Sequence, residues 1–341
     1  MFLRNCWYLA AWSDEIAAGD MLGRQIAGAF LLFVRDADGA LAALPDQCPH
    51  RLVPLSMGKC AGGIVECAYH GLRFAASGRC VTNPHGPVTS ALHLRPWPCV
   101  ERHSAVWVWL GEADADDGAI PDLGFIDRVP EEARVYGRLH STADYRLMTD
   151  NIMDLTHADY LHASSLGGGI NTRAKAEAVQ QGDGVTITWT ASNDRLAPLH
   201  AGFLDSEDGR GDFLNIVTWM APAVMRQRIA FALPGALESA PLDSMTCHVM
   251  TPETAGTTHY FFCHTSDGVT ADPAIAPQVH DALVAAFAGE DAPMLEAQTR
   301  RFAGRDFWSL KPALLPSDKG AVMVRRLLDR MMAEENKGLE Q

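Results

Sequence analysis

The 341-residue sequence has few basic residues, few cysteines and no long hydrophobic run. Its 28 Lys and Arg stand against 42 Asp and Glu, and a formal charge of −14 without a basic block argues against nucleic acid or anionic membrane as a partner. Eight cysteines are too sparse for a disulfide scaffold. The longest apolar runs, such as residues 27–34, are far short of the ~20 residues of a membrane helix, and the N-terminus resembles no secretory signal. Composition therefore predicts a soluble, cytoplasmic protein.

The apolar and charged fractions, 48% and 21%, are those of a folded chain with a sizeable core. Short apolar runs at residues 29–35, 40–45 and 104–110, separated by loops rich in Gly, Pro and Cys, predict β structure in the first third. Residues 112–121 are polar, acidic and closed by Gly and Pro, which favours a linker over an acidic docking patch. We therefore expect two domains, residues 1–120 and 121–341.

The second domain mixes helical and strand-like patterns. Helical spacing of apolar residues predicts helices over residues 144–162, 273–302 (interrupted near Gly289 and Pro293) and 319–335. Strand-like runs lie between the first two of these helices, at residues 184–190, 213–220, 227–233, 245–251 and 258–264. The domain should therefore combine helices with strands.

Two short loops of the first domain each carry one cysteine and one histidine. They read Cys48-Pro-His50 and Cys67-Ala-Tyr-His70, each beside Gly or Pro. A [2Fe–2S] cluster with two thiolates on one iron and two imidazoles on the other needs this ligand set. Structural Cys₂His₂ zinc is the alternative, but zinc fingers usually place two cysteines together and two histidines together. The mixed loops favour the iron–sulfur cluster.

The segment from Asp150 to His162 concentrates metal-ligand residue types. Asn151, Asp154 and His157 follow at intervals of three, while His157 and His162 share no helical face unless the helix turns or ends near His162. Two histidines and one carboxylate form the facial triad of non-haem Fe(II) oxygenases. The carboxylate must come from elsewhere, and Glu290-Asp291 is the best candidate. The alternative is a pair of ordinary surface or core histidines.

Taken together, these motifs resemble the Rieske non-haem iron oxygenases. The opening residues 4–10 and the segments 250–254 and 259–262 are similar to the vanillate O-demethylase and dicamba monooxygenase branch. The resemblance implies an α+β chain. Its N-terminal Rieske [2Fe–2S] domain would consist of small antiparallel β-sheets. Its C-terminal catalytic domain would be helix-grip-like, with an antiparallel sheet around a long helix and a mononuclear non-haem iron.

The resemblance also implies roles for particular residues. Asp291 matches the third iron ligand, with Glu290 as the fallback, and Asn151 matches an asparagine near the iron. Asp154 matches an aspartate that bridges His157 of its own chain to His70 of the partner subunit in a homotrimer. Two further positions, Arg228 and His248, match residues that line the substrate pocket.

The function implied is that of a terminal oxygenase component. It would use O₂ to O-demethylate a methoxylated, vanillate-like aromatic acid and release formaldehyde. An NAD(P)H-dependent reductase with a flavin and a ferredoxin-type cluster would supply electrons. The alternatives are hydroxylation of an aryl methyl group or of another aromatic acid, and a non-catalytic Rieske electron carrier.

Overall fold

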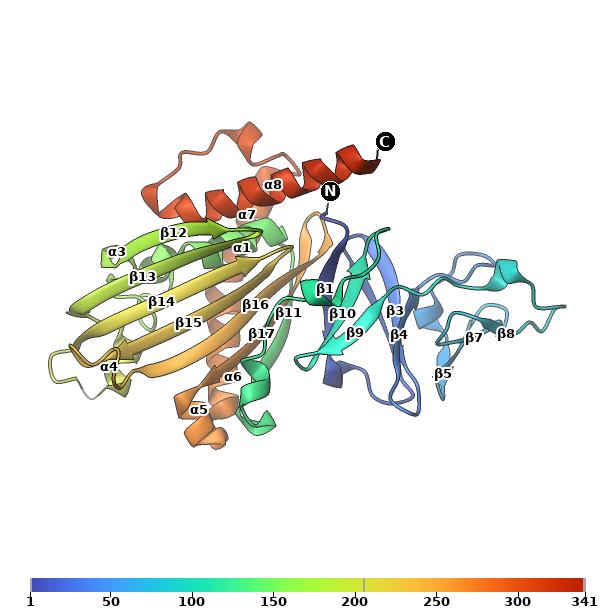
Figure 1. The fold of residues 1–341 in the computed structure, drawn as a ribbon, viewed down its shortest axis with the longest axis horizontal. Coiled ribbons are helices and arrows are strands. Elements are labelled where there is room, and N and C mark those ends of the chain that lie inside the picture. Colours follow the sequence, from blue (N-terminus) through green and yellow to red (C-terminus); the bar gives the residue numbers. More distant parts are fainter. Residues whose placement is uncertain (1, 205, 340–341) are drawn as a thin grey trace. The chain divides into compact units, whose positions relative to one another are not determined.

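The computed structural model describes residues 2–204 and 206–339 and divides the chain into two compact units (Figure 1). The first unit spans Phe2–Ile120 and the second begins at Pro121. Each unit buries its own set of large apolar side chains.

The N-terminal unit consists of three small antiparallel sheets, with strand orders β1-β10-β9, β2-β3-β4 and β5-β6-β7-β8. Its strands are β1 (Cys6–Trp12), β2 (Met21–Ile26), β3 (Ala29–Arg35), β4 (Leu41–Pro45), β5 (Lys59–Ala61), β6 (Ile64–Glu66), β7 (Arg73–Ala75), β8 (Cys80–Thr82), β9 (Cys99–Arg102) and β10 (Ala105–Leu110). The β structure predicted for residues 29–35, 40–45 and 104–110 is confirmed by β3, β4 and β10. Together the sheets confirm the predicted architecture of this part of the chain.

The C-terminal unit contains one seven-stranded antiparallel sheet, ordered β11-β17-β16-β15-β14-β13-β12. Its strands are β11 (Val135–Ser141), β12 (Lys175–Gln181), β13 (Gly184–Arg195), β14 (Arg210–Met220), β15 (Val224–Ala232), β16 (Leu242–Thr254) and β17 (Thr257–Ser266). The five predicted strands correspond to β13–β17. The two edge strands were not predicted; β12 buries only Ala178 and so lacks an alternating apolar pattern.

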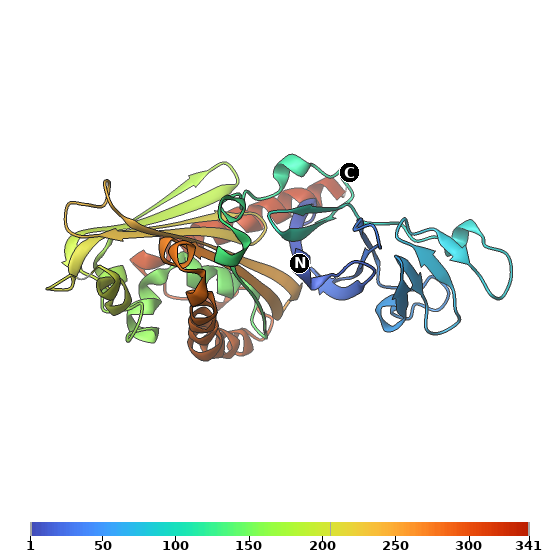
Figure 2. The ribbon, with the colours of Figure 1, turned by 90° about the horizontal axis from the view of Figure 1, so that it is seen from below.

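Helices pack against this sheet, and Figure 2 shows them gathered on one side of its curve. The helices are α1 (Tyr145–Met153), α2 (Ala158–Leu161), α3 (Ile170–Arg173), α4 (Pro198–Phe203), α5 (Asp267–Ala271), α6 (Ala276–Val284), α7 (Ala292–Phe302) and α8 (Lys319–Leu339), with a 3₁₀ turn η7 (Leu155–His157) and a π-helical turn η9 (Ala285–Asp291). α1 contacts β14 and β16, while α8 contacts β12, β13 and α1. This arrangement confirms the helix-grip-like fold. No helix within residues 2–204 and 206–339 is long and apolar enough to cross a membrane.

The register of the sheet defines two faces. Trp219 on β14 lies opposite Met225 on β15, which lies opposite His248 on β16. Trp219 also lines a small cavity together with Asp150 of α1, so these residues occupy the helix-covered face. Their strand neighbours point the other way because side chains alternate along a strand.

The predicted helix over residues 144–162 is wrong as a single element. α1 ends at Met153, and Asp154 has an extended backbone with φ −134° and ψ 95°. The Asp154 carboxylate accepts hydrogen bonds from the N–H and the hydroxyl of Thr156, at 3.0 and 2.7 Å. Such local side-chain hydrogen bonds compete with helix continuation. The chain therefore turns between α1 and the residues that follow it.

Candidate metal centres

The loops that carry the Cys-X-His and Cys-X-X-His motifs have the same backbone hydrogen bonds. In each, the cysteine N–H donates to the carbonyl five residues later, and the N–H four residues later donates to the cysteine carbonyl, all at 2.8–3.0 Å. The residue four positions after the cysteine has a positive φ in both loops, +60° at Leu52 and +68° at Gly71. The two loops are therefore equivalent supports for one ligand pair each.

The four motif residues meet between these loops. The rings of His50 and His70 lie 4.6 Å apart between centroids, and Cys48 and Cys67 are buried beside each other. Burial raises the pKa of Cys48, so this thiol would have to lose a proton before its thiolate could bind iron. Each loop thus supplies one thiol and one imidazole to the same place. This donor set fits a [2Fe–2S] cluster with two thiolates on one iron and two imidazoles on the other.

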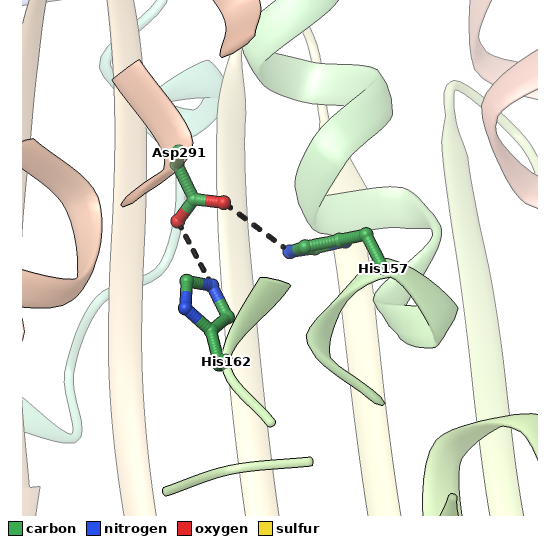
Figure 3. Close-up of side chains that lie close together, drawn as sticks. All are labelled: His157, His162 and Asp291. Atoms are coloured by element: carbon green, nitrogen blue, oxygen red, sulfur yellow. Dashed lines mark ion pairs between the residues drawn. The ribbon is translucent and has the colours of Figure 1, made fainter. Parts of the chain in front are cut away.

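A second group consists of His157, His162 and Asp291, whose ligand atoms converge (Figure 3). Asp291 is buried and directs one carboxylate oxygen to each imidazole. Oδ1 lies 3.5 Å from Nε2 of His157, and Oδ2 lies 3.2 Å from Nε2 of His162. Two neutral nitrogens and one carboxylate around a common point fit the facial triad of a non-haem iron.

The backbone after α1 fixes the orientation of His157. Its Nδ1 lies 2.6 Å from the carbonyl oxygen of Asp154. Because a carbonyl only accepts, Nδ1 carries the proton and Nε2 keeps its lone pair for a metal. The turn at Asp154 therefore selects the tautomer of His157.

His162 lies at the C-terminal end of α2 and is almost fully buried. Its Nε2 faces Asp291, while its Nδ1 lies 2.6 Å from a carboxylate oxygen of Glu290. The hydrogen bond with Asp291, then that with Glu290, raises the pKa of His162. Without a metal, both ring nitrogens thus have acidic partners.

Asn151 on α1 completes the group, since its Nδ2 donates to Asp291 Oδ1 at 3.1 Å. Its Oδ1 is buried without a hydrogen-bond partner among the residues that the structure describes. A buried unsatisfied oxygen usually marks a missing water or ion. The amide nitrogen of Asn151 therefore orients Asp291, and its amide oxygen remains as a hydrogen-bond acceptor at the site.

A π-helical turn supplies both acidic residues. Sequence reasoning expected the helix over residues 273–302 to be interrupted near Gly289, but the chain continues through α6, η9 and α7. Consecutive residues of an α-helix point about 100° apart, and π turns are frequent at functional sites. From this turn Glu290 and Asp291 both reach His162. Glu290, considered from sequence as a fallback metal ligand, here contacts the histidine instead.

The structure gives Asp154 a different contact with His157 from the one expected. The prediction placed its carboxylate against the imidazole, but the contact comes from its main-chain carbonyl. One carboxylate oxygen, Oδ1, accepts both hydrogen bonds from Thr156. The carboxylate is thus held by the turn itself.

Arg228 and His248, predicted to line one substrate pocket, lie on opposite faces of the sheet. Arg228 lies opposite Ile216 on one side and Met245 on the other, and these residues line a cavity of about 340 Å³ on the face away from α1. Its guanidinium is paired with Asp243. Only His248 lies on the helix-covered face, and the charge of Asp291 acts on it.

His248 belongs to a chain of hydrogen bonds that crosses four neighbouring strands, β14 to β17. Its Nε2 donates to Gln227 Oε1 at 2.9 Å, and its Nδ1 accepts from the Tyr260 hydroxyl at 2.8 Å. The Gln227 amide in turn donates to Asn215 at 3.2 Å. Burial lowers the pKa of His248 to about 4, so it is neutral at pH 7.

Three residues of this chain, Asn215, Gln227 and Tyr260, were not predicted from the sequence. The sequence signal that could have found them is a polar residue at a strand position that points into the core, such as Asn215 between the buried residues Phe213 and Val217.

Comparison with known proteins places this architecture in a family. Residues 141–334 match the Vanillate O-demethylase oxygenase C-terminal domain, and residues 6–94 match the Rieske [2Fe-2S] domain. The chain therefore belongs to the Rieske non-haem iron oxygenases, as a terminal oxygenase component. Its cofactors are a Rieske [2Fe–2S] cluster and a mononuclear non-haem iron, and it acts with partner proteins that deliver electrons.

Individual relatives match over nearly their whole length. The chain is 36% identical to the oxygenase component of chloroacetanilide N-alkylformylase from Rhizorhabdus wittichii, over 99% of this chain and 97% of the relative. It is 36% identical to the oxygenase component of dicamba O-demethylase from Stenotrophomonas maltophilia, over 97% and 98%. The structure of dicamba monooxygenase bound to dicamba matches with a TM-score of 0.90 and 34% identity, over 98% of this chain and 99% of that one.

Proposed function

We propose that this oxygenase removes the methyl group from a methoxylated aromatic acid, with vanillate or a close relative as substrate. The observation that carries the proposal is the buried polar chain from Asn215 to Tyr260 on the helix-covered face of the sheet, where the charge of Asp291 on η9 acts on His248. Relatives of similar length are named for vanillate, dicamba and toluene-4-sulfonate, all aromatic acids. Neutral amide and imidazole groups can bind an anion without burying a second charge.

In this proposal His157, His162 and Asp291 hold the iron, and Cys48, His50, Cys67 and His70 hold the cluster. When bound, these groups supply O₂ activation and electron storage. Methoxyarene, O₂, NAD(P)H and a proton yield phenol, formaldehyde, water and NAD(P)⁺: the methyl carbon gains a hydroxyl, and the resulting hemiacetal releases formaldehyde. Asn151 orients Asp291, and the sheet face positions the acid.

The proposal extends to the assembly and partners of the chain. We propose that the chain forms a homotrimer in which Asp154 approaches His70 of the partner subunit. An NAD(P)H-dependent reductase with a flavin and a ferredoxin-type cluster would supply its electrons. The protein would be cytoplasmic. The support is the family membership together with the position of Asp154 at the N-cap of the 3₁₀ turn that ends at His157. Sedimentation of the iron-loaded protein tests the trimer independently of turnover.

The first test is formaldehyde release in a single turnover. The iron-loaded protein, reduced chemically so that no reductase is needed, would be mixed with O₂ and vanillate, other methoxybenzoates or unmethoxylated benzoate. We expect formaldehyde with a methoxybenzoate and none with benzoate. If the cluster reoxidises in the presence of each acid without formaldehyde, the demethylase proposal fails, and hydroxylated methyl or ring products would support the rival oxygenase reaction.

A second test compares the two faces of the sheet. His248→Phe removes both hydrogen bonds of the imidazole while keeping a ring of similar size, and Arg228→Gln changes the opposite face. His248→Phe releases Gln227 and Tyr260, the polar groups that would contact the acid in this proposal. A hydrogen bond to a charged group contributes about 1.5–3 kcal/mol, so loss of one such contact should weaken substrate binding by roughly 10- to 150-fold. Equilibrium binding of the acid should be unchanged in Arg228→Gln. Weakened binding in Arg228→Gln alone would place the acid on the other face.

A further inference from the structure

We propose that Glu290 is a positioning residue for His162: its carboxylate holds the proton on Nδ1, so that Nε2 is presented to the metal. This inference rests on the proposed metal site of His157, His162 and Asp291, and adds a residue that does not itself bind the metal.

The geometry leaves one arrangement of the ring when a metal is bound. Glu290 Oε2 lies 2.6 Å from Nδ1 of His162, and Nε2 faces Asp291 Oδ2 at 3.2 Å. A carboxylate accepts hydrogen bonds, so the remaining ring proton stays on Nδ1 and Nε2 supplies its lone pair. Carboxylate–histidine pairs of this kind fix the ring and make the ligand nitrogen more basic.

The two histidines of the site are therefore held by different acceptors. Nδ1 of His157 donates to the neutral carbonyl of Asp154, whereas Nδ1 of His162 faces a carboxylate. His162 should accordingly be the more basic ligand. The side chain of His162 is 4% exposed, so little else can hold its ring in place of Glu290.

The position of Glu290 favours a hydrogen bond to His162 over direct binding of the metal. Its side chain is 41% exposed, so its carboxylate remains hydrated on one side while it contacts His162 on the other. The converging ligand atoms belong to His157, His162 and Asp291 and do not include Glu290. The π turn thus gives the two adjacent acidic residues separate tasks on the two nitrogens of one ring.

The test measures metal affinity rather than turnover. Fe(II) binding by the cluster-loaded protein would be measured by anaerobic equilibrium dialysis for the unmodified chain, Glu290→Ala, Glu290→Gln, His162→Ala and Glu334→Ala. Glu334 is an exposed glutamate on α8 and serves as the matched control. Absorbance of the Rieske cluster and far-ultraviolet circular dichroism check that each variant is folded.

We expect Glu290→Ala to weaken Fe(II) binding by about 10- to 100-fold, the usual effect of losing an outer partner of a metal ligand. Glu290→Gln should bind more tightly than Glu290→Ala, because its amide oxygen still accepts from Nδ1. Glu334→Ala should bind like the unmodified chain, and His162→Ala should not retain iron.

Three results would overturn the inference. Unchanged affinity in Glu290→Ala removes the positioning role while leaving the metal site intact. Complete loss equal to that of His162→Ala makes Glu290 a direct ligand, and Glu290→Gln binding no better than Glu290→Ala contradicts a hydrogen-bond role. Normal binding by His162→Ala is a different failure, since it refutes the proposed metal site itself.

Discussion

His157→Ala should leave the visible spectrum of the Rieske cluster unchanged and abolish turnover. The substitution removes one of three converging ligands and leaves one imidazole and one carboxylate, which cannot form the facial triad. Turnover should fall by more than about 100-fold, the loss that follows removal of a residue hydrogen-bonded to a metal ligand. Product formation per cluster, together with iron content, measures the effect.

The matched control for this variant is His280→Ala, which removes a partly exposed histidine of α6 that contacts Asp281. Its turnover and iron content should equal those of the unmodified protein. Turnover by His157→Ala at the control rate would show that His157 is not an iron ligand.

Asp154→Asn should retain both metal centres and slow the passage of electrons between them by about 100-fold. Asparagine keeps the Oδ1 atom that accepts from Thr156, so the turn before His157 is preserved and only the charge is lost. The main-chain carbonyl of Asp154 already holds His157. The proposed role of its carboxylate is therefore the contact with His70 of the partner subunit, and a neutral amide weakens that contact. Reoxidation of the reduced cluster by substrate and O₂, followed by stopped flow, measures this step.

Asp272→Asn is a suitable control, because Asp272 also caps a short 3₁₀ turn through its Oδ1. It should leave reoxidation unchanged. A single-turnover rate in Asp154→Asn equal to that of the control would remove the bridging role, whereas loss of iron would indicate that the charge matters for the mononuclear site itself.

The metal motifs stand out in the sequence because their proposed ligands are close together in the chain. Cys48 and His50 are two residues apart, and Cys67 and His70 three apart, so a short loop fixes each pair whatever the surrounding fold. Asp291 lies far from His157 in sequence, and it was considered only because two histidines need a third ligand; the structure brings the three residues together. The family resemblance, rather than spacing, selected it over Glu290.

The faces of the sheet could not be predicted in the same way. Arg228 and His248 were each placed on a strand, but whether they share a face depends on strand register. A shift of one residue turns every side chain of a strand to the other face. The pairing of Met225 with His248 and of Arg228 with Met245 settles this point, and no local sequence pattern contains it.

The breaks in helical structure were also beyond the sequence pattern. Apolar spacing over residues 144–162 is helical on both sides of Asp154, and the competing hydrogen bonds to Thr156 become visible only in three dimensions. Gly289 and Pro293 indicated the correct region of the second helix. They could not distinguish an interruption from a π turn through which the helix continues.

The π turn η9 makes the proposed iron site depend on chain length as well as on residue identity. A π turn is equivalent to one residue inserted into an α-helix, and losing that residue would rotate the acidic pair relative to α6 by about 100°. A descendant of this gene could therefore keep both histidines and the aspartate yet lose iron through a single in-frame codon deletion. A sequence comparison that considers only the identities of the ligand residues would score the metal site of such a descendant as intact. The number of residues between α6 and Asp291 should therefore be compared as well.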